Sequence, residues 1–109
     1  MLSQATKLKA GPLEFAHELV EQTWNNLSQV DLLIQNHLKE WKQERLSASL
    51  NALLRLAVTE INHWPKTDAK VILNEMVEIC KKYVDPEAAS LANGILHKLS
   101  ATLGRLPGV

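Results

Sequence analysis

The sequence predicts an all-α protein that folds as a compact orthogonal bundle of about five helices. Apolar residues recur three and four positions apart along most of the 109 residues, which is the spacing of one face of a helix. Helix start signals, in which a capping side chain or a proline precedes an apolar run, occur at several points. No segment shows the alternation of apolar and polar residues that is typical of a strand.

The most apolar segment, residues 50–61, is expected to form the central helix. At 3.6 residues per turn its aliphatic side chains share one broad stripe, and Asn51, Arg55 and Thr59 lie opposite. Burying each large aliphatic side chain contributes roughly 1.5–3 kcal/mol before conformational entropy is counted, so this helix needs several neighbours to cover it. The stripe consists of Leu50, Leu53, Leu54, Ala57, Val58 and Ile61.

Two helices are predicted before the central one. The first begins at Pro12, because a proline suits the first turn of a helix, where its missing N–H has no partner. The second begins near Ser28, which together with Asp31 resembles a capping box. The first apolar face comprises Phe15, Ala16, Leu19, Val20, Thr23, Trp24 and Leu27, and the second comprises Val30, Leu33, Ile34, His37, Leu38 and Trp41.

A fourth helix is predicted after the central one, which should end near His63 because Pro65 disfavours helical geometry at Trp64. Thr67 or Asp68 can cap the new helix with its side-chain oxygen. The predicted inner face of this helix comprises Val71, Ile72, Leu73, Met76, Val77, Ile79, Cys80 and Tyr83.

Asp85 followed by Pro86 marks the start of the last helix, as a cap followed by a first-turn proline. Its buried face is predicted to contain Ala88, Leu91, Ala92, Ile95, Leu96 and Leu99. The whole pattern predicts one helical domain over residues 11–103, a flexible amino-terminal arm over 1–10 and a frayed tail over 104–109.

The charges and the single cysteine limit the possible functions. Twelve basic and twelve acidic residues balance, so any RNA contact must come from a local patch rather than from the overall field. Cys80 cannot form an internal disulfide, and its place on an apolar face predicts a buried thiol. The amino terminus has no apolar run of signal-peptide length, and no segment approaches the ~20 apolar residues that span a bilayer. We therefore expect a cytoplasmic protein without a membrane partner.

Two Glu-x-x-His spacings, Glu14 to His17 and Glu60 to His63, could hold metal ions in a helical bundle. Such a site needs both pairs to project inward together with two further glutamates, and solvated side chains are the more common outcome. No Gly-rich phosphate loop or catalytic triad is evident, so the sequence predicts neither an enzyme nor a bound metal or cofactor. Gly94 inside a helix costs about 1 kcal/mol relative to alanine, which indicates close approach of another helix or a ligand.

Four stretches taken together resemble the NusB family of bacterial transcription antitermination factors. They are residues 15–20, 52–61, 71–83 and 91–96. The resemblance implies an all-helical fold that binds the boxA element of the ribosomal RNA leader together with a small ribosomal-subunit protein. It further implies that this complex joins the RNA polymerase elongation complex and suppresses termination.

The resemblance also implies where these partners bind. Positions near the family's RNA surface fall on the last helix, and an outward polar face of the preceding helix would meet the protein partner, with ordinary solvated charges as the alternative. The RNA-binding candidates are Lys7, Lys9, Ser90, Leu91, Asn93 and Gly94, and the protein-binding candidates are Asn74, Glu75 and Glu78.

The sequence also departs from the family pattern. Family members usually begin with an arginine-rich helix and a second helix before the segment that starts here at Gly11, and neither is found. Lys7 and Lys9 replace little of that phosphate-binding charge, and Leu91 stands where the family tends to have phenylalanine. The apolar face of the helix over residues 12–27 would have packed against the missing helices, so we expect a homodimer or a larger assembly.

The sequence leaves three functions open. The first is a non-enzymatic RNA- and protein-binding antitermination factor in ribosomal RNA synthesis. The second is a NusB-like accessory domain of a ribosomal RNA cytosine methyltransferase. The third is a helical interaction scaffold that has lost RNA binding.

Overall fold

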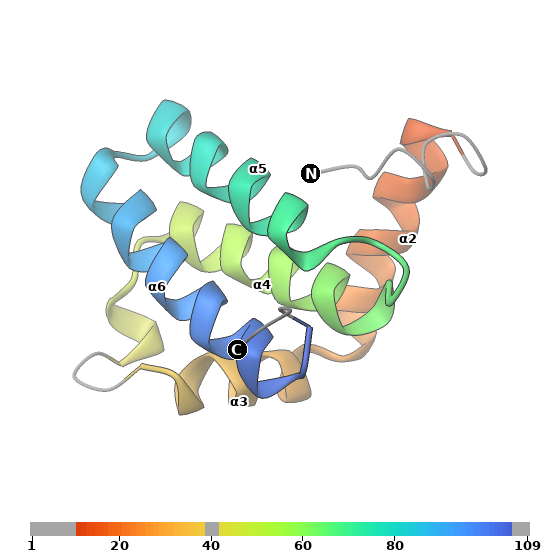
Figure 1. Ribbon diagram of the computed structural model, residues 1–109, viewed down its shortest axis with the longest axis horizontal. Coiled ribbons are helices and arrows are strands. Elements are labelled where there is room, and N and C mark those ends of the chain that lie inside the picture. Colours follow the sequence, from red (N-terminus) through yellow and green to blue (C-terminus); the bar gives the residue numbers. More distant parts are fainter. Residues whose placement is uncertain (1–10, 39–41, 106–109) are drawn as a thin grey trace.

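Five α-helices and one 3-10 helix make up the part of the chain that the computed structural model describes, residues 11–38 and 42–105. These elements are α2 (Pro12–Asn25), α3 (Leu27–Asn36), η1 (Gln43–Arg45), α4 (Ala48–His63), α5 (Ala69–Tyr83) and α6 (Pro86–Thr102). α4 runs through the middle and contacts α2, α3, α5 and α6 (Figure 1). No strand occurs in the described ranges, and the all-α prediction is confirmed. The predicted arm, residues 1–10, and residues 106–109 of the predicted tail lie outside the described residues.

α4 supplies the centre of the hydrophobic core, as predicted for residues 50–61. Leu54, Ala57, Val58 and Ile61 are fully buried, because α3, α5 and α6 cover most of the apolar stripe. α2 packs on the remaining side of α4, with its own apolar side chains buried at Phe15 and Leu19. The other large buried side chains of the core include Val30, Ile34, Ile72, Met76, Leu96 and Leu99.

Three helices begin at a side chain that caps backbone N–H groups. Ser47, Asp68 and Asp85 accept hydrogen bonds from N–H groups two or three residues further on, at 3.1, 2.9 and 2.7 Å respectively. Each of these residues has an extended backbone, so its side-chain oxygen can reach the first turn. The predicted caps at Asp68 and Asp85 are confirmed, and Ser47 is an additional one.

The predicted capping box at Ser28 and Asp31 is wrong. α3 begins at Leu27, and only Asn26 separates it from α2, so Ser28 already lies in the first turn. The Asn26 side chain donates backward to the carbonyl of Gln22, in the last turn of α2, at 2.8 Å and does not cap the start of α3. The two helices are nearly continuous, so the junction lacks the extended residue that a capping side chain requires.

Several residues predicted for buried faces are exposed. The exposed fraction is 59% for Val20, 75% for Trp24, 43% for Val71 and 71% for Tyr83, so these residues of the predicted apolar faces do not belong to the core. Periodicity identifies the apolar stripe of a helix, but not how much of it neighbouring helices cover. Tyr83 is the last residue of α5, where the cover ends. Trp41 lies outside the described residues.

Two polar side chains of α4 are buried, although the sequence predicts that they face solvent. The Thr59 hydroxyl donates to the carbonyl of Arg55 at 2.9 Å. The Glu60 carboxyl group is fully buried, and neither oxygen has a hydrogen-bond partner among the described residues. Burial disfavours the charged form and raises the pKa of Glu60 to about 7.

Arg105 ties the carboxyl end of α6 to the end of α4. Gly104, with a φ of 69°, supplies the left-handed turn that leads out of α6. The Arg105 guanidinium then donates to the backbone carbonyls of Ile61, Trp64 and Thr67, the last two at 3.2 and 2.5 Å. The carbonyls at the carboxyl end of a helix lack intrahelical partners and favour positive charge. The Arg105 side chain therefore supplies hydrogen bonds to carbonyl groups at and just after the end of α4.

Candidate functional site

α5 and α6 form a helical hairpin that brings the two predicted sets of site residues together. Only Val84 and Asp85 separate the helices, which run side by side in opposite directions (Figure 1). Residues equally far from this connection therefore lie at the same level, so the Glu78 level of α5 corresponds to the Leu91 level of α6. The exposed members of the two sets are Asn74, Glu78, Ser90, Asn93 and Gly94.

The remaining candidates are less accessible or lie elsewhere. Leu91 is partly buried and packs against the hydrophobic core, so only part of its side chain can meet a ligand. Glu75 is also partly buried. Lys7 and Lys9 lie outside the described residues.

Gly94 does not mark a close approach within the described chain. A Cβ atom built on it would meet no heavy atom within 4 Å, and the residue is exposed. The prediction that another helix of this chain approaches Gly94 is therefore wrong.

Sequence reasoning missed Tyr83, which extends from the end of α5 into solvent. The Nζ atom of Lys82 lies 5.4 Å from the centre of the Tyr83 ring, within range of a cation–π interaction. A shallow hollow of about 410 Å³ adjoins the ring and is lined by Glu78, Ile79, Lys81, Lys82 and Tyr83. The signal in the sequence was the Lys81-Lys82-Tyr83 run directly before a predicted helix end.

An exposed aromatic ring with one ammonium group beside it and a second lysine lining the adjoining hollow has the chemistry of a single-stranded nucleic-acid contact, because bases stack on rings and phosphates pair with lysines. Ser90 and Asn93 follow on the neighbouring helix and offer hydrogen-bonding groups. We call these five residues, Lys81, Lys82, Tyr83, Ser90 and Asn93, the α5–α6 surface.

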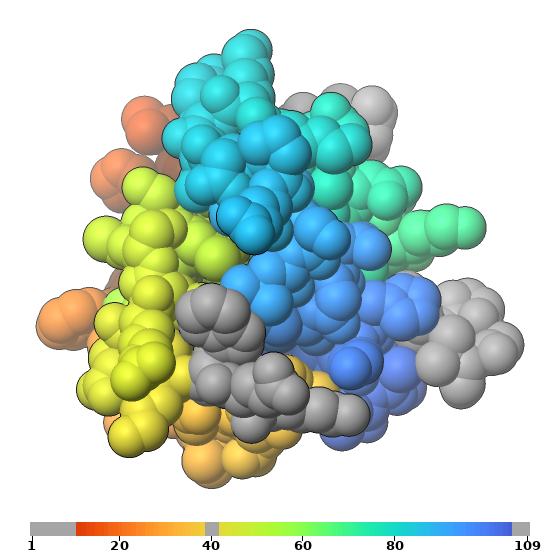
Figure 2. All heavy atoms as spheres, turned by 90° about the vertical axis from the view of Figure 1, so that its left-hand side faces the viewer, coloured from red at the N-terminus to blue at the C-terminus, as the bar shows by residue number. Residues whose placement is uncertain are grey.

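The end of α5 and the start of α6 reach the surface on the same face as η1 and the start of α4 (Figure 2). Basic and acidic side chains are mixed in these elements, so no strong local charge results. Phosphate binding on this face therefore depends on a few individual contacts. The exposed charged residues of these elements are Lys42, Glu44, Arg45, Glu78, Lys81, Lys82, Asp85 and Glu87.

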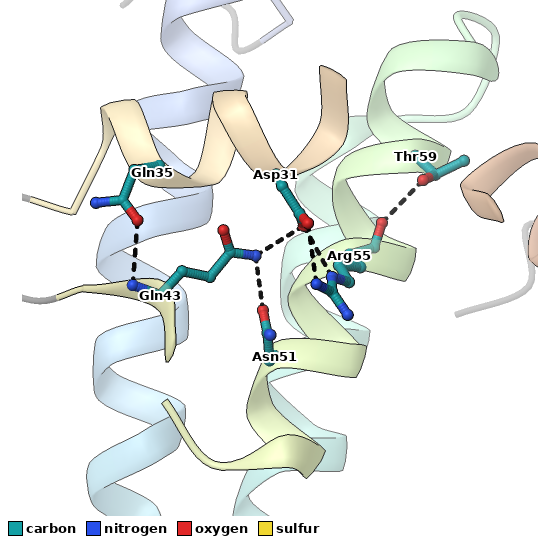
Figure 3. A network of polar contacts seen from close by, with 6 residues as sticks. All are labelled: Asp31, Gln35, Gln43, Asn51, Arg55 and Thr59. Carbon is teal, nitrogen blue, oxygen red and sulfur yellow. Dashed lines mark hydrogen bonds and ion pairs between the residues drawn. The ribbon is translucent and has the colours of Figure 1, made fainter. Parts of the chain in front are cut away.

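A polar network joins η1 and α3 to α4 (Figure 3). Arg55 donates two hydrogen bonds to Asp31, at 2.8 and 2.9 Å, and the Gln43 side chain donates to Asp31 at 2.7 Å and to Asn51 at 2.9 Å. Partial burial acts to raise the pKa of Asp31, but the hydrogen bonds from Arg55 and Gln43 outweigh it and hold the pKa below its usual value. A hollow of about 600 Å³ lies beside the network, whose groups already pair with one another. We assign the network a structural role.

The two Glu-x-x-His pairs do not form one site. Glu14 and His17 are both exposed on α2, whereas Glu60 is buried and His63 is exposed at the end of α4. In the described ranges, no group of three or more His, Cys, Asp or Glu side chains is placed to hold a metal ion. Cys80 is buried as predicted, and burial raises the pKa of its thiol. None of the helices in residues 11–38 and 42–105 combines the length and apolar character needed to cross a membrane.

Comparisons with known proteins agree with the resemblance in the sequence. The family model for NusB matches residues 2–101. The chain is 37% identical over 101 residues to the transcription antitermination protein NusB of Helicobacter pylori strain Shi470, a match that covers 93% of this chain and 72% of the relative. The NusB protein of Helicobacter acinonychis gives the same values. That of Lysinibacillus sphaericus is 35% identical over 86 residues, or 79% of this chain and 68% of the relative.

No solved structure matches this chain. The family match extends over nearly the whole sequence, and the helical bundle agrees with it. The protein is thus a member of the NusB family.

Proposed function

We propose that the protein is a non-enzymatic transcription antitermination factor that acts in the cytoplasm during ribosomal RNA synthesis. In this proposal it binds a boxA-like element of the RNA leader together with a small ribosomal-subunit protein, and the complex joins the RNA polymerase elongation complex. Membership of the family supports this activity, and the names of the relatives favour it over a methyltransferase accessory domain. The observation that carries RNA binding is the exposed Tyr83 ring beside Lys82, next to a hollow that Lys81 also lines.

RNA would bind along the α5–α6 surface as a single strand. One base stacks on Tyr83, while Lys81 and Lys82 pair with the flanking phosphates. Ser90 and Asn93, which are exposed on α6, would then form hydrogen bonds to the base edges of further nucleotides.

The protein partner would bind the outward polar face of α5. Asn74 and Glu78 are exposed there, and the Glu78 carboxylate lies 3.5 Å from Lys81 Nζ. An exposed ion pair of this kind contributes little to stability, so Glu78 can exchange Lys81 for a basic side chain of the partner. Because Lys81 belongs to the α5–α6 surface, that exchange would free its charge for RNA and couple the two binding events.

RNA binding can be tested with a fluorescently labelled boxA-like oligonucleotide and a scrambled oligonucleotide of the same length. Tyr83→Ala should weaken binding by about 1–3 kcal/mol, or about 5- to 150-fold, because the stacked base loses its platform. Lys81→Ala combined with Lys82→Ala should flatten the plot of log K against log salt by about 1.4, since each neutralised phosphate contributes about 0.7 on single strands. Fluorescence anisotropy from about 50 to 200 mM salt measures both effects.

Lys66→Ala combined with Lys70→Ala is the matched control, because it removes the same charge from exposed positions in the first turn of α5 and in the loop before it. It should leave the salt slope unchanged. Equal slopes for the two double variants, or equal affinities for the boxA-like and scrambled oligonucleotides, would contradict the proposed RNA site.

The proposed protein site predicts that Glu78→Lys weakens binding of the small ribosomal-subunit protein by about tenfold, through repulsion of its basic side chains. Binding of the purified partner to the chain with boxA-like RNA present can be measured by calorimetry. Glu44→Lys, the same change at an exposed residue of η1, should have no effect. If both variants weaken the partner to the same extent, α5 is not the docking helix.

A further inference from the structure

α2 carries an apolar surface that the proposed function does not use. Leu13, Val20 and Trp24 are 71%, 59% and 75% exposed. Together with His17 they recur four, three and four residues apart, which is the spacing of the seam in a coiled coil. A seam of this kind fits the apolar stripe of another helix.

The seam continues from α2 onto α4. One hollow of about 580 Å³ is lined by Ala16, His17, Val20, Glu21 and Trp24. A second, of about 220 Å³, is lined by Val20, Thr23, Trp24, Leu27, Ala52, Arg55 and Leu56. A helix placed along Val20 and Trp24 would therefore fill both hollows and rest on α2 and α4 together. We call Leu13, His17, Val20, Trp24, Leu27, Ala52 and Leu56 the α2 surface.

One flank of the α2 surface is acidic. Glu14, Glu18 and Glu21 are exposed, and at 100° per residue they lie together on the side of the seam away from the buried residues Phe15 and Leu19. α2 contains no lysine or arginine to offset them. The row of carboxylates favours a positively charged partner, and it disfavours a second copy of this chain, which would bring two such rows to one interface.

From the seam, the hollows and the acidic flank, we infer that the α2 surface binds an amphipathic helix of another protein, whose apolar stripe is flanked by lysine or arginine side chains. The apolar stripe packs over Val20 and Trp24, and the basic flank faces Glu18 and Glu21. This is the helix-in-groove mode of recognition, in which apolar anchors give affinity and the flanking charges select the partner and its orientation.

Two synthetic peptides of about 20 residues serve as probes. Both carry leucine at the seam positions, and they differ only in having lysine or glutamate along one flank. Calorimetry with the full chain at low salt should show that the lysine peptide binds at least about tenfold more tightly than the glutamate peptide, because only the lysine flank pairs with the acidic row. Glu18→Lys combined with Glu21→Lys should reverse this preference. Glu14 is kept, since an acidic residue in the first turn stabilises the helix.

Glu44→Lys combined with Glu87→Lys is the matched control, with the same change of charge at exposed positions away from α2, and should keep the wild-type preference. Trp24→Ala should weaken binding of the lysine peptide without changing any charge. It serves as a second test if the α2 charge variant, Glu18→Lys combined with Glu21→Lys, unfolds. The α2 charge variant should bind boxA-like RNA like the wild type, which separates this inference from the proposed function.

Three results would overturn the inference. The first is wild-type chain that binds neither peptide, and the second is equal affinity for both peptides. The third is a wild-type chain that sediments as a dimer at micromolar concentration and becomes a monomer with Trp24→Ala, which would identify a second copy as the occupant.

Discussion

Replacement of Leu54 by aspartate is expected to leave the protein without a cooperative unfolding transition. Leu54 is fully buried at the centre of α4, where helices on several sides surround it. The substitution places a carboxylate where the surroundings are apolar, and it removes a large aliphatic side chain from the core. The combined loss should exceed about 5 kcal/mol, which is comparable to the whole stability of a small domain. Circular dichroism during heating or urea titration measures the transition.

Leu32→Asp provides the control, because it makes the same chemical change on α3 at a side chain that is 61% exposed. Its stability should stay within about 0.5 kcal/mol of the parent. Leu54→Ala should fall between the two, losing about 2–5 kcal/mol while still unfolding cooperatively. A cooperative melt of Leu54→Asp at the parent's temperature would contradict the placement of α4 in the core.

Replacement of Glu60 by glutamine is expected to stabilise the protein above neutral pH and to flatten the pH dependence of its stability. The pKa of Glu60 rises from 4.5 to about 7 on folding, so the folded state binds the proton more tightly than the unfolded state. Stability therefore falls as the pH rises through this window, by about 3 kcal/mol at about 1.4 kcal/mol per pH unit. Glutamine is neutral throughout and removes this loss.

Urea unfolding of both proteins between about pH 4.5 and 8 measures this effect through the free energy of unfolding. Near pH 4.5 the two proteins should be similar in stability, and near pH 8 the variant should be more stable. Glu21→Gln, at an exposed position on α2, should follow the parent at every pH. If Glu60→Gln also follows the parent, the carboxyl group finds a compensating charge or donor in solution.

Local signals in the sequence predicted where the helices lie. The caps that form and the side chains that are buried depend also on how the helices pack together. Asp68 and Asp85 act as caps because the backbone of each is extended, and at Asp85 the following Pro86 already favours that conformation. Ser28 has the right side chain but lies within a nearly continuous pair of helices, so its cap never forms. The apolar stripe of residues 50–61 predicted which helix lies at the centre of the bundle. The burial of Glu60 could not be predicted in this way, because it depends on how the other helices surround α4.

The candidate site was predictable only in part for a similar reason. The resemblance to the family pointed to polar positions on α5 and α6, and the hairpin brings those positions to neighbouring helices. Tyr83 has the same apolar spacing as the buried residues of α5, and only the end of the helix leaves its ring in solvent. Trp24 likewise lies on the predicted apolar face of its helix, and periodicity does not reveal that no described element covers this part of α2.

The hydrogen bonds of Arg105 have a consequence for how the polypeptide folds as it is synthesised. The three carbonyls that this side chain binds belong to residues 38 to 44 positions earlier. On the ribosome, α4 can coil as soon as it emerges, but the acceptors at its exit remain hydrated until Arg105 has been added and released. Closure of this corner therefore comes only after α2 to α6 have all been translated.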